Sequence, residues 1–301
     1  MVPQRPSNLL PKGYIGVMKA GEGGNGYAHF CLPTQALEST TDQRPEIETL
    51  KPQLRVIKTT KIMSLSDAPT SRFITLVNES GLDEAAGPWL AIAPILGRTL
   101  ERFVKPYSSG GKHLPMEFVW HVFLQAFEGI AFLHSQEIIH GDLFDRNVMF
   151  DPSQQDFPGF PNVVIIDFGS AKILKSTKFL GQHSPEEHLA NDAWSAYDLI
   201  YRLTWEGVEN RRVAPDVEDP WNRFTKDLDD MRLATGNVWQ ETKGWDTYLF
   251  LRKWGKVAAE ARDNTPPKVF QEIASALNVD KLHKKIDDSL QAVVKRHAGT
   301  R

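Results

Sequence analysis

The sequence predicts an α+β protein with a smaller β-rich part followed by a larger helical part. Short runs of alternating apolar and polar residues surround a glycine cluster in residues 13–33 and recur in LRVIKTTK at 54–61. Helical stripes of apolar residues run through 114–135 and 279–294. At 301 residues the chain has the size at which one core begins to divide into two lobes or domains.

Composition indicates an ordinary globular protein and narrows the classes of partner. Hydrophobic residues make up 41% and charged residues 24%. A net charge of −3 gives no general attraction to nucleic acid or to an anionic membrane, so we expect neither as a partner. The single cysteine, Cys31, cannot form an internal disulfide, and the N-terminal residues lack the apolar core of a secretory signal. No apolar run approaches the length that spans a bilayer, and we expect an intracellular protein, cytoplasmic or nuclear.

The first β-like segment contains a possible phosphate-binding hairpin. Gly21, Gly23 and Gly26 form G-x-G-x-x-G, with Gly24 as a fourth glycine. Without a Cβ, such a turn can bring backbone N–H groups close to phosphate oxygens. A glycine-rich hairpin is more often only a turn, so the motif needs support from the rest of the chain. Lys58, in the next strand-like run, is open to two interpretations, a phosphate-binding lysine or a solvated one on an edge strand, and without the later motifs the second is favoured.

The long helical segment before residue 138 has an apolar stripe about four turns long. A core helix explains it without any functional role. Its members are Phe118, Val122, Phe123, Phe127, Ile130 and Leu133.

The stretch from Ile138 to Lys172 carries the chemistry. It contains His140-Gly141-Asp142, then Asn147, and a β-branched run that ends in Asp167-Phe168-Gly169. A carboxylate at Asp142 can orient and deprotonate a hydroxyl, while Asn147 and Asp167 can hold magnesium ions that neutralise a transferring phosphoryl group.

This order of motifs resembles the protein kinase family, and most closely a divergent, fungal-looking serine/threonine-type kinase. Two later motifs extend the resemblance, Ser184-Pro185-Glu186 and the D-x-W-S of residues 192–195. The resemblance covers residues 16–205 and implies a bilobal fold: a flexible arm over 1–12, a β-rich N-lobe over 13–93, and a helical C-lobe over 94–301. It also implies a helix within 66–80, where either Glu79 or Arg72 falls at the position of the glutamate that pairs with Lys58.

The same resemblance assigns the site. Asp142 is implied as the catalytic base, with Lys58 and Arg146 as catalytic cations and with Asn147 and Asp167 as the Mg²⁺ ligands. It implies ATP as the second cofactor, with contacts from one set of residues in the nucleotide pocket: Gly21, Gly23, Gly24, Gly26, Ala28, Val56, Lys58, Ile92, Ala93, Ile95, Thr99 and Met149.

Several positions depart from the family pattern. Gly141 replaces the usual arginine and so removes the cation that binds an activation-loop phosphate, and we therefore expect no gating by activation-loop phosphorylation. Phe144 replaces a lysine that contacts the transferring phosphate, and Arg146 can supply that charge instead or lie at the surface. The resemblance implies that Glu186 closes the activation segment, where its partner is either Arg262 or none.

We therefore predict Mg²⁺-dependent transfer of the ATP γ-phosphoryl group to a serine or threonine hydroxyl of a protein substrate. Two alternatives stay open at this point. One is a pseudokinase that acts as a binding or scaffold module, and the other is a small-molecule kinase of the aminoglycoside or choline type, which also uses His-Gly-Asp.

Overall fold

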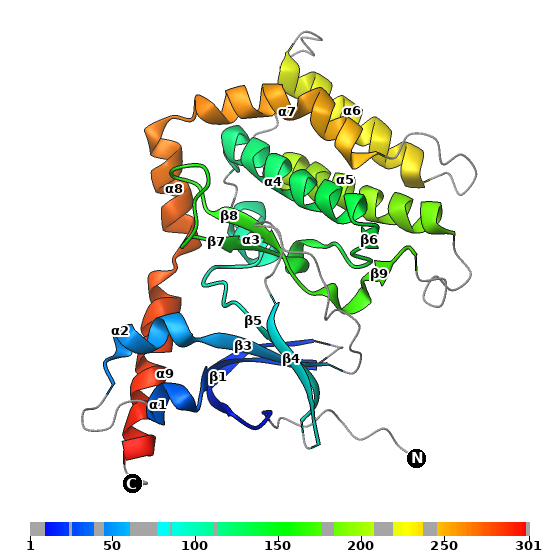
Figure 1. Cartoon of the computed structure of the whole chain (residues 1–301). Helices are drawn as coiled ribbons and strands as arrows, with labels where there is room; N and C mark the ends of the chain where they lie inside the picture. The colour runs from blue at the N-terminus through cyan, green and yellow to red at the C-terminus, as the bar shows by residue number, and fades with distance from the viewer. Residues whose placement is uncertain are drawn as a thin grey trace. The chain divides into compact units, whose positions relative to one another are not determined.

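The computed structural model describes residues 10–23, 26–38, 45–60, 77–84, 86–110, 113–175, 184–207, 219–236 and 246–298. These residues form two compact units (Figure 1). The first contains the described residues up to Leu96 together with those from Val279, and the second contains Gly97 to Asn278. The predicted division into a β-rich and a helical part is confirmed.

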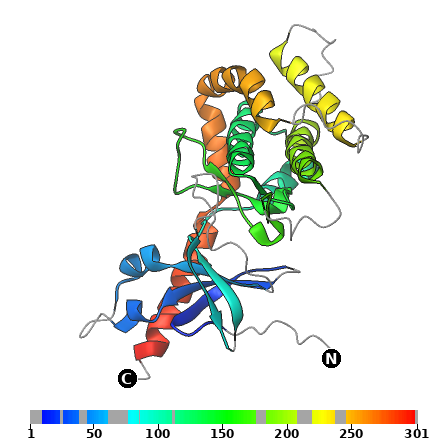
Figure 2. The same cartoon turned by 45° about the vertical axis from the view of Figure 1, so that its right-hand side comes forward.

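The first unit is built on an antiparallel five-stranded sheet in the order β1-β2-β3-β5-β4. Its strands are β1 (Tyr14–Gly23), β2 (Gly26–Pro33), β3 (Arg55–Thr60), β4 (Val77–Asp83) and β5 (Gly87–Ile92). The short helices α1 (Gln35–Glu38) and α2 (Ile47–Leu50) and the 3₁₀ turn η1 (Lys51–Gln53) lie between β2 and β3. The long helix α9 (Asp280–Ala298) runs beside the sheet in both views (Figures 1 and 2).

Alternation along the strands separates the core of this unit into two clusters. Phe30, Leu32 and Val56 lie in one cluster, and Cys31 and Ile57 lie in the other. Successive side chains of a strand point to opposite faces, which explains the division. Helix α9 contributes four buried aliphatic side chains to the first cluster: Ile286, Leu290, Val293 and Val294.

The position of α9 differs from the lobe boundary drawn from sequence, which placed residues 94–301 together. The predicted apolar stripe does form a helix, but the helix packs with β2, β3, α1 and α2. The stripe has four fully buried members on one face, and the first cluster offers them an apolar surface. Residues 279–298 therefore belong structurally to the β-rich unit.

The second unit is mainly helical. Its helices are α3 (Leu100–Gly110), α4 (Met116–Ser135), α5 (Pro185–Gly207), α6 (Pro220–Gly236), α7 (Thr247–Asp263) and α8 (Pro267–Leu277). Two small antiparallel sheets lie beside them, β6 (Ile138–Ile139) with β9 (Lys172–Ile173) and β7 (Val148–Asp151) with β8 (Asn162–Ile165). The 3₁₀ turns η2 (Asp145–Asn147) and η3 (Phe168–Ser170) complete the unit.

Helix α4 is the centre of this unit. All six residues of its predicted stripe are buried, and Trp120, Phe123 and Phe127 contact aromatic rings of the later helices. Among the described residues, α4 alone is long and apolar enough to cross a membrane, contrary to the sequence expectation that no run approached that length. Its most apolar window is 72% buried inside the unit, as in the core helix of a soluble protein.

His121 of α4 should make the stability of this unit depend on pH. Its Nε2 lies 2.8 Å from the Pro161 carbonyl oxygen, and burial, aided by the charge of Arg262, lowers its pKa to about 4. The unfolded chain binds this proton near pH 6.5, so stability is complete above that pH and falls by about 3 kcal/mol towards pH 4. Between pH 7 and pH 5 we expect wild type to lose about 2 kcal/mol more than His121→Gln in urea unfolding. Equal losses in the two proteins would contradict this assignment.

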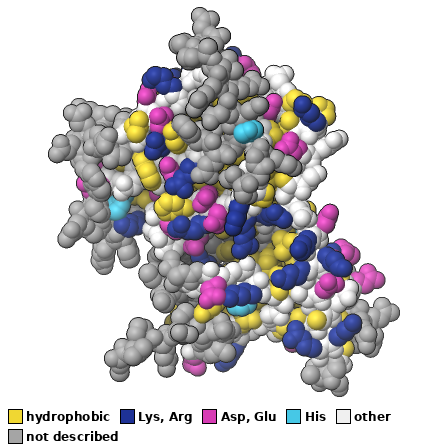
Figure 3. Space-filling model, turned by 180° about the vertical axis from the view of Figure 1, so that it is seen from behind, with side chains coloured by type: hydrophobic (Ala, Val, Ile, Leu, Met, Phe, Trp, Pro, Cys, Tyr) yellow, Lys and Arg dark blue, Asp and Glu magenta, His cyan; other side chains and the backbone are white. Residues whose placement is uncertain are grey.

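Charged side chains of both signs are interspersed on the face seen in Figure 3, in keeping with the small net charge.

Candidate active site

The loop that carries Asp142 is anchored by the buried carboxylate of Asp192. Asp192 of α5 accepts the backbone N–H of His140 at 2.5 Å and that of Gly141 at 2.8 Å. The side chain of Asp192 is only 2% exposed, so these hydrogen bonds are strong and shielded from water. The D-x-W-S motif noted in the sequence therefore supplies the anchor of the loop rather than a reacting group.

Gly141 is required by the backbone around it. Its φ is +76°, and a Cβ placed there would lie 2.6 Å from the carbonyl oxygen of Ser170. Both the left-handed conformation and the close approach exclude a side chain. The missing arginine at this position thus has a steric basis in the fold.

Replacing Gly141 with alanine should destabilise the protein by about 1–3 kcal/mol, because the new Cβ meets backbone and the conformation is strained. Urea unfolding of the variant measures this loss. Gly255→Ala in α7 is the matched control, since its Cβ would meet only Leu251 at 3.7 Å. The control should gain about 0.5–1 kcal/mol, as expected for glycine within a helix, and a similar gain for Gly141→Ala would refute the steric argument.

The Asp142 carboxylate is fixed by two side chains of the same loop. Arg146 Nη2 donates to Oδ1 at 2.7 Å, and Asn147 Nδ2 donates to Oδ2 at 2.9 Å. Asn147 Nδ2 also donates to the backbone carbonyl of Asp142 at 2.7 Å. The carboxylate is 27% exposed, so it is oriented by the loop and still reachable from solvent.

Arg146 is held on both sides. Besides its ion pair with Asp142, its guanidinium carbon lies 4.5 Å from the centre of the Phe144 ring. Such a cation–π contact contributes about 0.5–1 kcal/mol at an exposed site. Phe144, which replaces the usual lysine, therefore helps to position the Arg146 cation beside Asp142.

The β7–β8 hairpin brings Asn147 and Asp167 to one end of a small sheet. Val148 pairs with Ile165, and the Ile166 N–H donates to the Asn147 carbonyl at 2.8 Å. Asp167 has φ 64° and ψ 71°, an unusual conformation for a residue other than glycine, and its Oδ1 accepts the Gly169 N–H at 3.2 Å. Strain of this kind typically costs about 1–3 kcal/mol and is found at functional sites.

The donor set at this end of the hairpin suits Mg²⁺. The Asn147 amide nitrogen is engaged by Asp142, which leaves its Oδ1 as the amide atom that can bind a cation, and Asp167 adds a carboxylate. Across the described ranges, no cluster of three or more His, Cys, Asp or Glu side chains could hold a metal ion by itself. Mg²⁺ commonly takes only one or two protein oxygens and completes its octahedron with phosphate and water.

His140 is a structural residue in this geometry. Its Nδ1 accepts the Asp142 N–H at 3.2 Å and its Nε2 donates to the Ile166 carbonyl at 2.9 Å. The ring also contacts Phe168 edge-on, with centroids 5.0 Å apart. Both ring nitrogens are thus used to join the Asp142 loop to the segment before Asp167.

In the first unit, the structure places the predicted nucleotide residues on four neighbouring strands of the sheet, β1, β2, β3 and β5. Ala28 of β2 is the register partner of Lys58 on β3, and Val56 lies two residues earlier on the same face as Lys58. Ile92 pairs with Val56 and packs against the same apolar cluster as Ala28. The glycines form the predicted hairpin, with Gly21 and Gly23 in β1 and Gly26 opening β2, whereas Gly24 lies outside the described residues.

The segment that follows β5 contains the remaining predicted nucleotide contacts. Ala93 and Ile95 lie in a stretch without regular structure before Gly97. Thr99 forms an isolated antiparallel bridge with Met149, so two residues predicted for one pocket are neighbours. The Thr99 hydroxyl also accepts the Arg102 N–H at 3.3 Å and caps α3, a role that sequence reasoning missed.

Two sequence predictions about ion pairs are not supported. Glu79 lies in strand β4 rather than in a helix, and it accepts the hydroxyl of Tyr14 at 2.8 Å. Burial, reinforced by Glu79, raises the pKa of Tyr14 and keeps that hydroxyl a donor. Arg262 lies 4.2 Å from the Phe157 ring and reaches Asp263, so it does not serve Glu186. Arg72 lies outside the described residues.

The second unit thus brings the Asp142 carboxylate, the Asn147 amide and the Asp167 carboxylate onto one loop and the hairpin that follows it. Residues 87–202 match the family model described as "Protein kinase domain". This part of the chain is therefore similar to protein kinase domains.

Two relatives illustrate the similarity. The eIF-2-alpha kinase GCN2 of Arabidopsis thaliana is 31% identical over 133 residues, which cover 44% of this chain and 9% of that protein. The serine/threonine-protein kinase PSK1 of Saccharomyces cerevisiae is 35% identical over 99 residues, covering 28% of this chain and 7% of that protein. In each case the match spans less than a tenth of the relative's length.

Proposed function

We propose that this protein transfers the γ-phosphoryl group of ATP to a serine or threonine hydroxyl of a protein, with Mg²⁺ as the required metal. The observation that carries the proposal is the geometry around Asp142, where Arg146 and Asn147 fix the carboxylate and Asn147 keeps its amide oxygen for a cation. The names of the two relatives, both protein kinases, support the substrate class.

The residues have separate roles in this mechanism. Asp142 accepts the proton of the attacking hydroxyl and aligns that oxygen with the transferring phosphoryl group. Asn147 and Asp167 hold Mg²⁺, which supplies neutralisation of phosphate charge when it is bound. Arg146, steadied by Phe144, places positive charge beside the acceptor site, and Lys58 of β3 is assigned to the phosphates of the nucleotide.

We also propose that activity does not require a phosphorylated activation loop. The support is the steric exclusion of any side chain at residue 141, where the phosphate-binding arginine would have to stand. The loop is already anchored by Asp192, whose side-chain oxygens accept the backbone N–H groups of His140 and Gly141. Phosphatase treatment of the purified protein should leave its rate of transfer unchanged.

Removal of Mg²⁺ should abolish transfer. Purified protein is incubated with γ-labelled ATP, generic protein substrates and small alcohols, with Mg²⁺ or with excess EDTA. We expect label on protein only with Mg²⁺, because the two protein oxygens hold phosphate through the metal. Label confined to small alcohols would replace the proposal with a small-molecule kinase, and no label with Mg²⁺ would favour a pseudokinase.

Nucleotide binding can be measured without turnover. ATP at 100 times its Kd should stabilise the folded protein by about 2.7 kcal/mol, seen as a rise in Tm. If Asn147 and Asp167 hold the metal, the increase in Tm caused by ATP should require Mg²⁺ in the wild-type protein. In the Asp167→Asn variant, Mg²⁺ should no longer change that increase. A Mg²⁺ dependence retained in Asp167→Asn would contradict the ligand assignment.

A further inference from the structure

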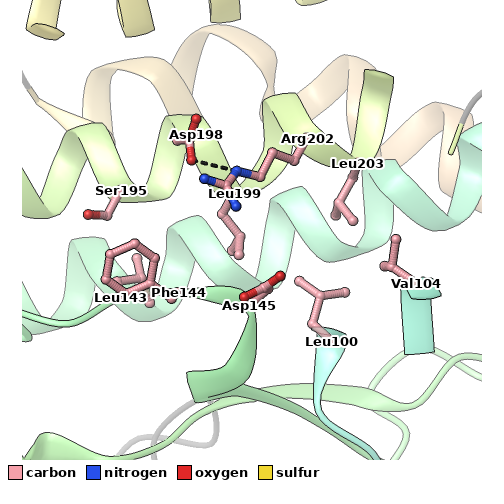
Figure 4. A pocket seen from close by; sticks show the side chains of 10 residues that line it. All are labelled: Leu100, Val104, Leu143, Phe144, Asp145, Ser195, Asp198, Leu199, Arg202 and Leu203. Carbon is pink, nitrogen blue, oxygen red and sulfur yellow. Dashed lines mark ion pairs between the residues drawn. The ribbon is translucent and has the colours of Figure 1, made fainter. Parts of the chain in front are cut away.

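A small pocket lies in the second unit beside the Asp142 loop (Figure 4). It is shallow: only about 20 Å³ of it admits the centre of a water-sized sphere, and its wider empty space of about 410 Å³ includes open solvent. Side chains from α3, α5 and the loop converge on it, and five of them are aliphatic and buried at its base: Leu100, Val104, Leu143, Leu199 and Leu203. The size and the aliphatic base suit one apolar side chain better than a large organic ligand.

The polar rim of the pocket has an unbalanced negative charge. Asp198 is neutralised by Arg202 four residues later, with Nε and Oδ2 2.8 Å apart (Figure 4). Asp145 accepts the backbone N–H of Arg146 at 2.9 Å, and within the described residues no cation forms an ion pair with its carboxylate. A ligand with a positive charge next to its apolar group would complement this rim.

The pocket is continuous with the proposed catalytic residues. Phe144 and Asp145 line it and follow Asp142 by two and three residues. Three residues of extended chain span at most about 10 Å, so the rim lies within that reach of the base. An extended peptide whose hydroxyl is at Asp142 covers the same distance in about three residues.

Phe144 links the two sites directly. Its ring forms part of the pocket wall and also lies against the guanidinium of Arg146. A side chain bound in the pocket would therefore pack against Phe144. Phe144 contacts Arg146, and Arg146 forms the ion pair with the Asp142 carboxylate.

We propose that this pocket binds an aliphatic side chain of the protein substrate, about three residues from the acceptor hydroxyl and next to a lysine or arginine that faces Asp145. The inference rests on the proposed function, since it names the sequence preference of the same acceptor site. It adds a requirement that a catalytic loop alone does not impose, namely a leucine-like residue near the acceptor.

The first test uses the unaltered protein. The substrates are a set of serine peptides. Each peptide has a single leucine, placed two, three or four residues before or after the serine, with an arginine next to the leucine. Each peptide is compared with a second one in which alanine replaces the leucine. At one position we expect alanine to lower kcat/KM by at least about 10-fold, because apolar pockets discriminate by roughly that factor per methylene. Equal kcat/KM for every leucine and alanine pair would overturn the proposal.

Two variants then locate the effect. Ser195→Phe fills the pocket mouth from α5 and should remove the preference for leucine while leaving the alanine peptide unaffected. Asp145→Lys should reduce the preference for arginine by up to about 5-fold, the size of an exposed ion pair. A leucine preference that survives Ser195→Phe would place the selecting site elsewhere.

Binding separates this proposal from the proposed function. Fluorescence anisotropy of a labelled peptide measures affinity without ATP, and the leucine peptide should bind wild type more tightly than Ser195→Phe. If this difference is present but no phosphate is transferred, the pocket stands and the kinase assignment fails. If phosphate is transferred but neither affinity nor kcat/KM depends on leucine, the pocket assignment fails alone.

Discussion

Replacing Asp142 with asparagine lowers the rate of phosphoryl transfer by about 10²- to 10⁴-fold and leaves the protein folded. The carboxamide has nearly the same shape, and the side chain is 27% exposed, so the loop loses little stability. What is lost is the acceptor for the hydroxyl proton. Steady-state transfer of label from γ-labelled ATP gives the rate, and urea unfolding confirms that the variant is folded.

The matched control is Asp230→Asn, an exposed carboxylate of α6 whose only described ion pair is with Lys226. It should transfer phosphate at the wild-type rate. Asp167→Asn should lose as much activity as Asp142→Asn, through the metal rather than the proton. A wild-type rate in Asp142→Asn would mean that another group, or water, takes the proton.

The chemistry of the site could be predicted because its residues are close together in the chain. Asp142 and Asn147 share one loop, and Asp167 ends the hairpin that follows it. Their types and spacing are the sequence features on which the proposed phosphoryl-transfer loop rests. The local hydrogen bonds that fix Asp142 also follow from that spacing, since a 3₁₀ turn at 145–147 returns Asn147 to it.

Contacts between residues distant in sequence could not be predicted in the same way. The clash at residue 141 involves the carbonyl of Ser170, and no property of a glycine in sequence identifies that neighbour. Glu79 was expected within a helix, and it proved to be in β4, where it pairs across the sheet with β5. The pocket beside Phe144 likewise needs α3 and α5 in place before it exists.

The last helix shows both the strength and the limit of the periodic signal. Its apolar stripe predicts an amphipathic helix, and α9 forms over Asp280–Ala298. A stripe does not specify which apolar surface will cover it. The sequence placed it with the helical lobe because the helices of the tail adjoin it in the chain, while its burial is with Phe30 and Leu32 of β2.

Truncating Leu290 of α9 to alanine should therefore weaken the β-rich unit, by about 2–5 kcal/mol. Leu290 is fully buried in the cluster that contains Val56 and that Ala28 adjoins, two residues assigned to the nucleotide. The cavity left by the side chain should loosen that cluster, so we expect weaker ATP binding as well as a lower unfolding free energy. Urea unfolding and titration with ATP measure the two effects.

Gln291→Ala, one residue along the same helix and exposed, is the control and should change neither quantity by more than about 0.5 kcal/mol. If Leu290→Ala behaves like this control, α9 is not part of the core of the unit. If it lowers stability but leaves ATP affinity intact, the helix supports the sheet without supporting the nucleotide site. If Leu290→Ala lowers both the unfolding free energy and the affinity for ATP, α9 is needed for nucleotide binding. The reason is that α9 completes the core of the sheet to which the nucleotide is assigned. The phosphoryl transfer assigned to Asp142 would then depend on α9 as well.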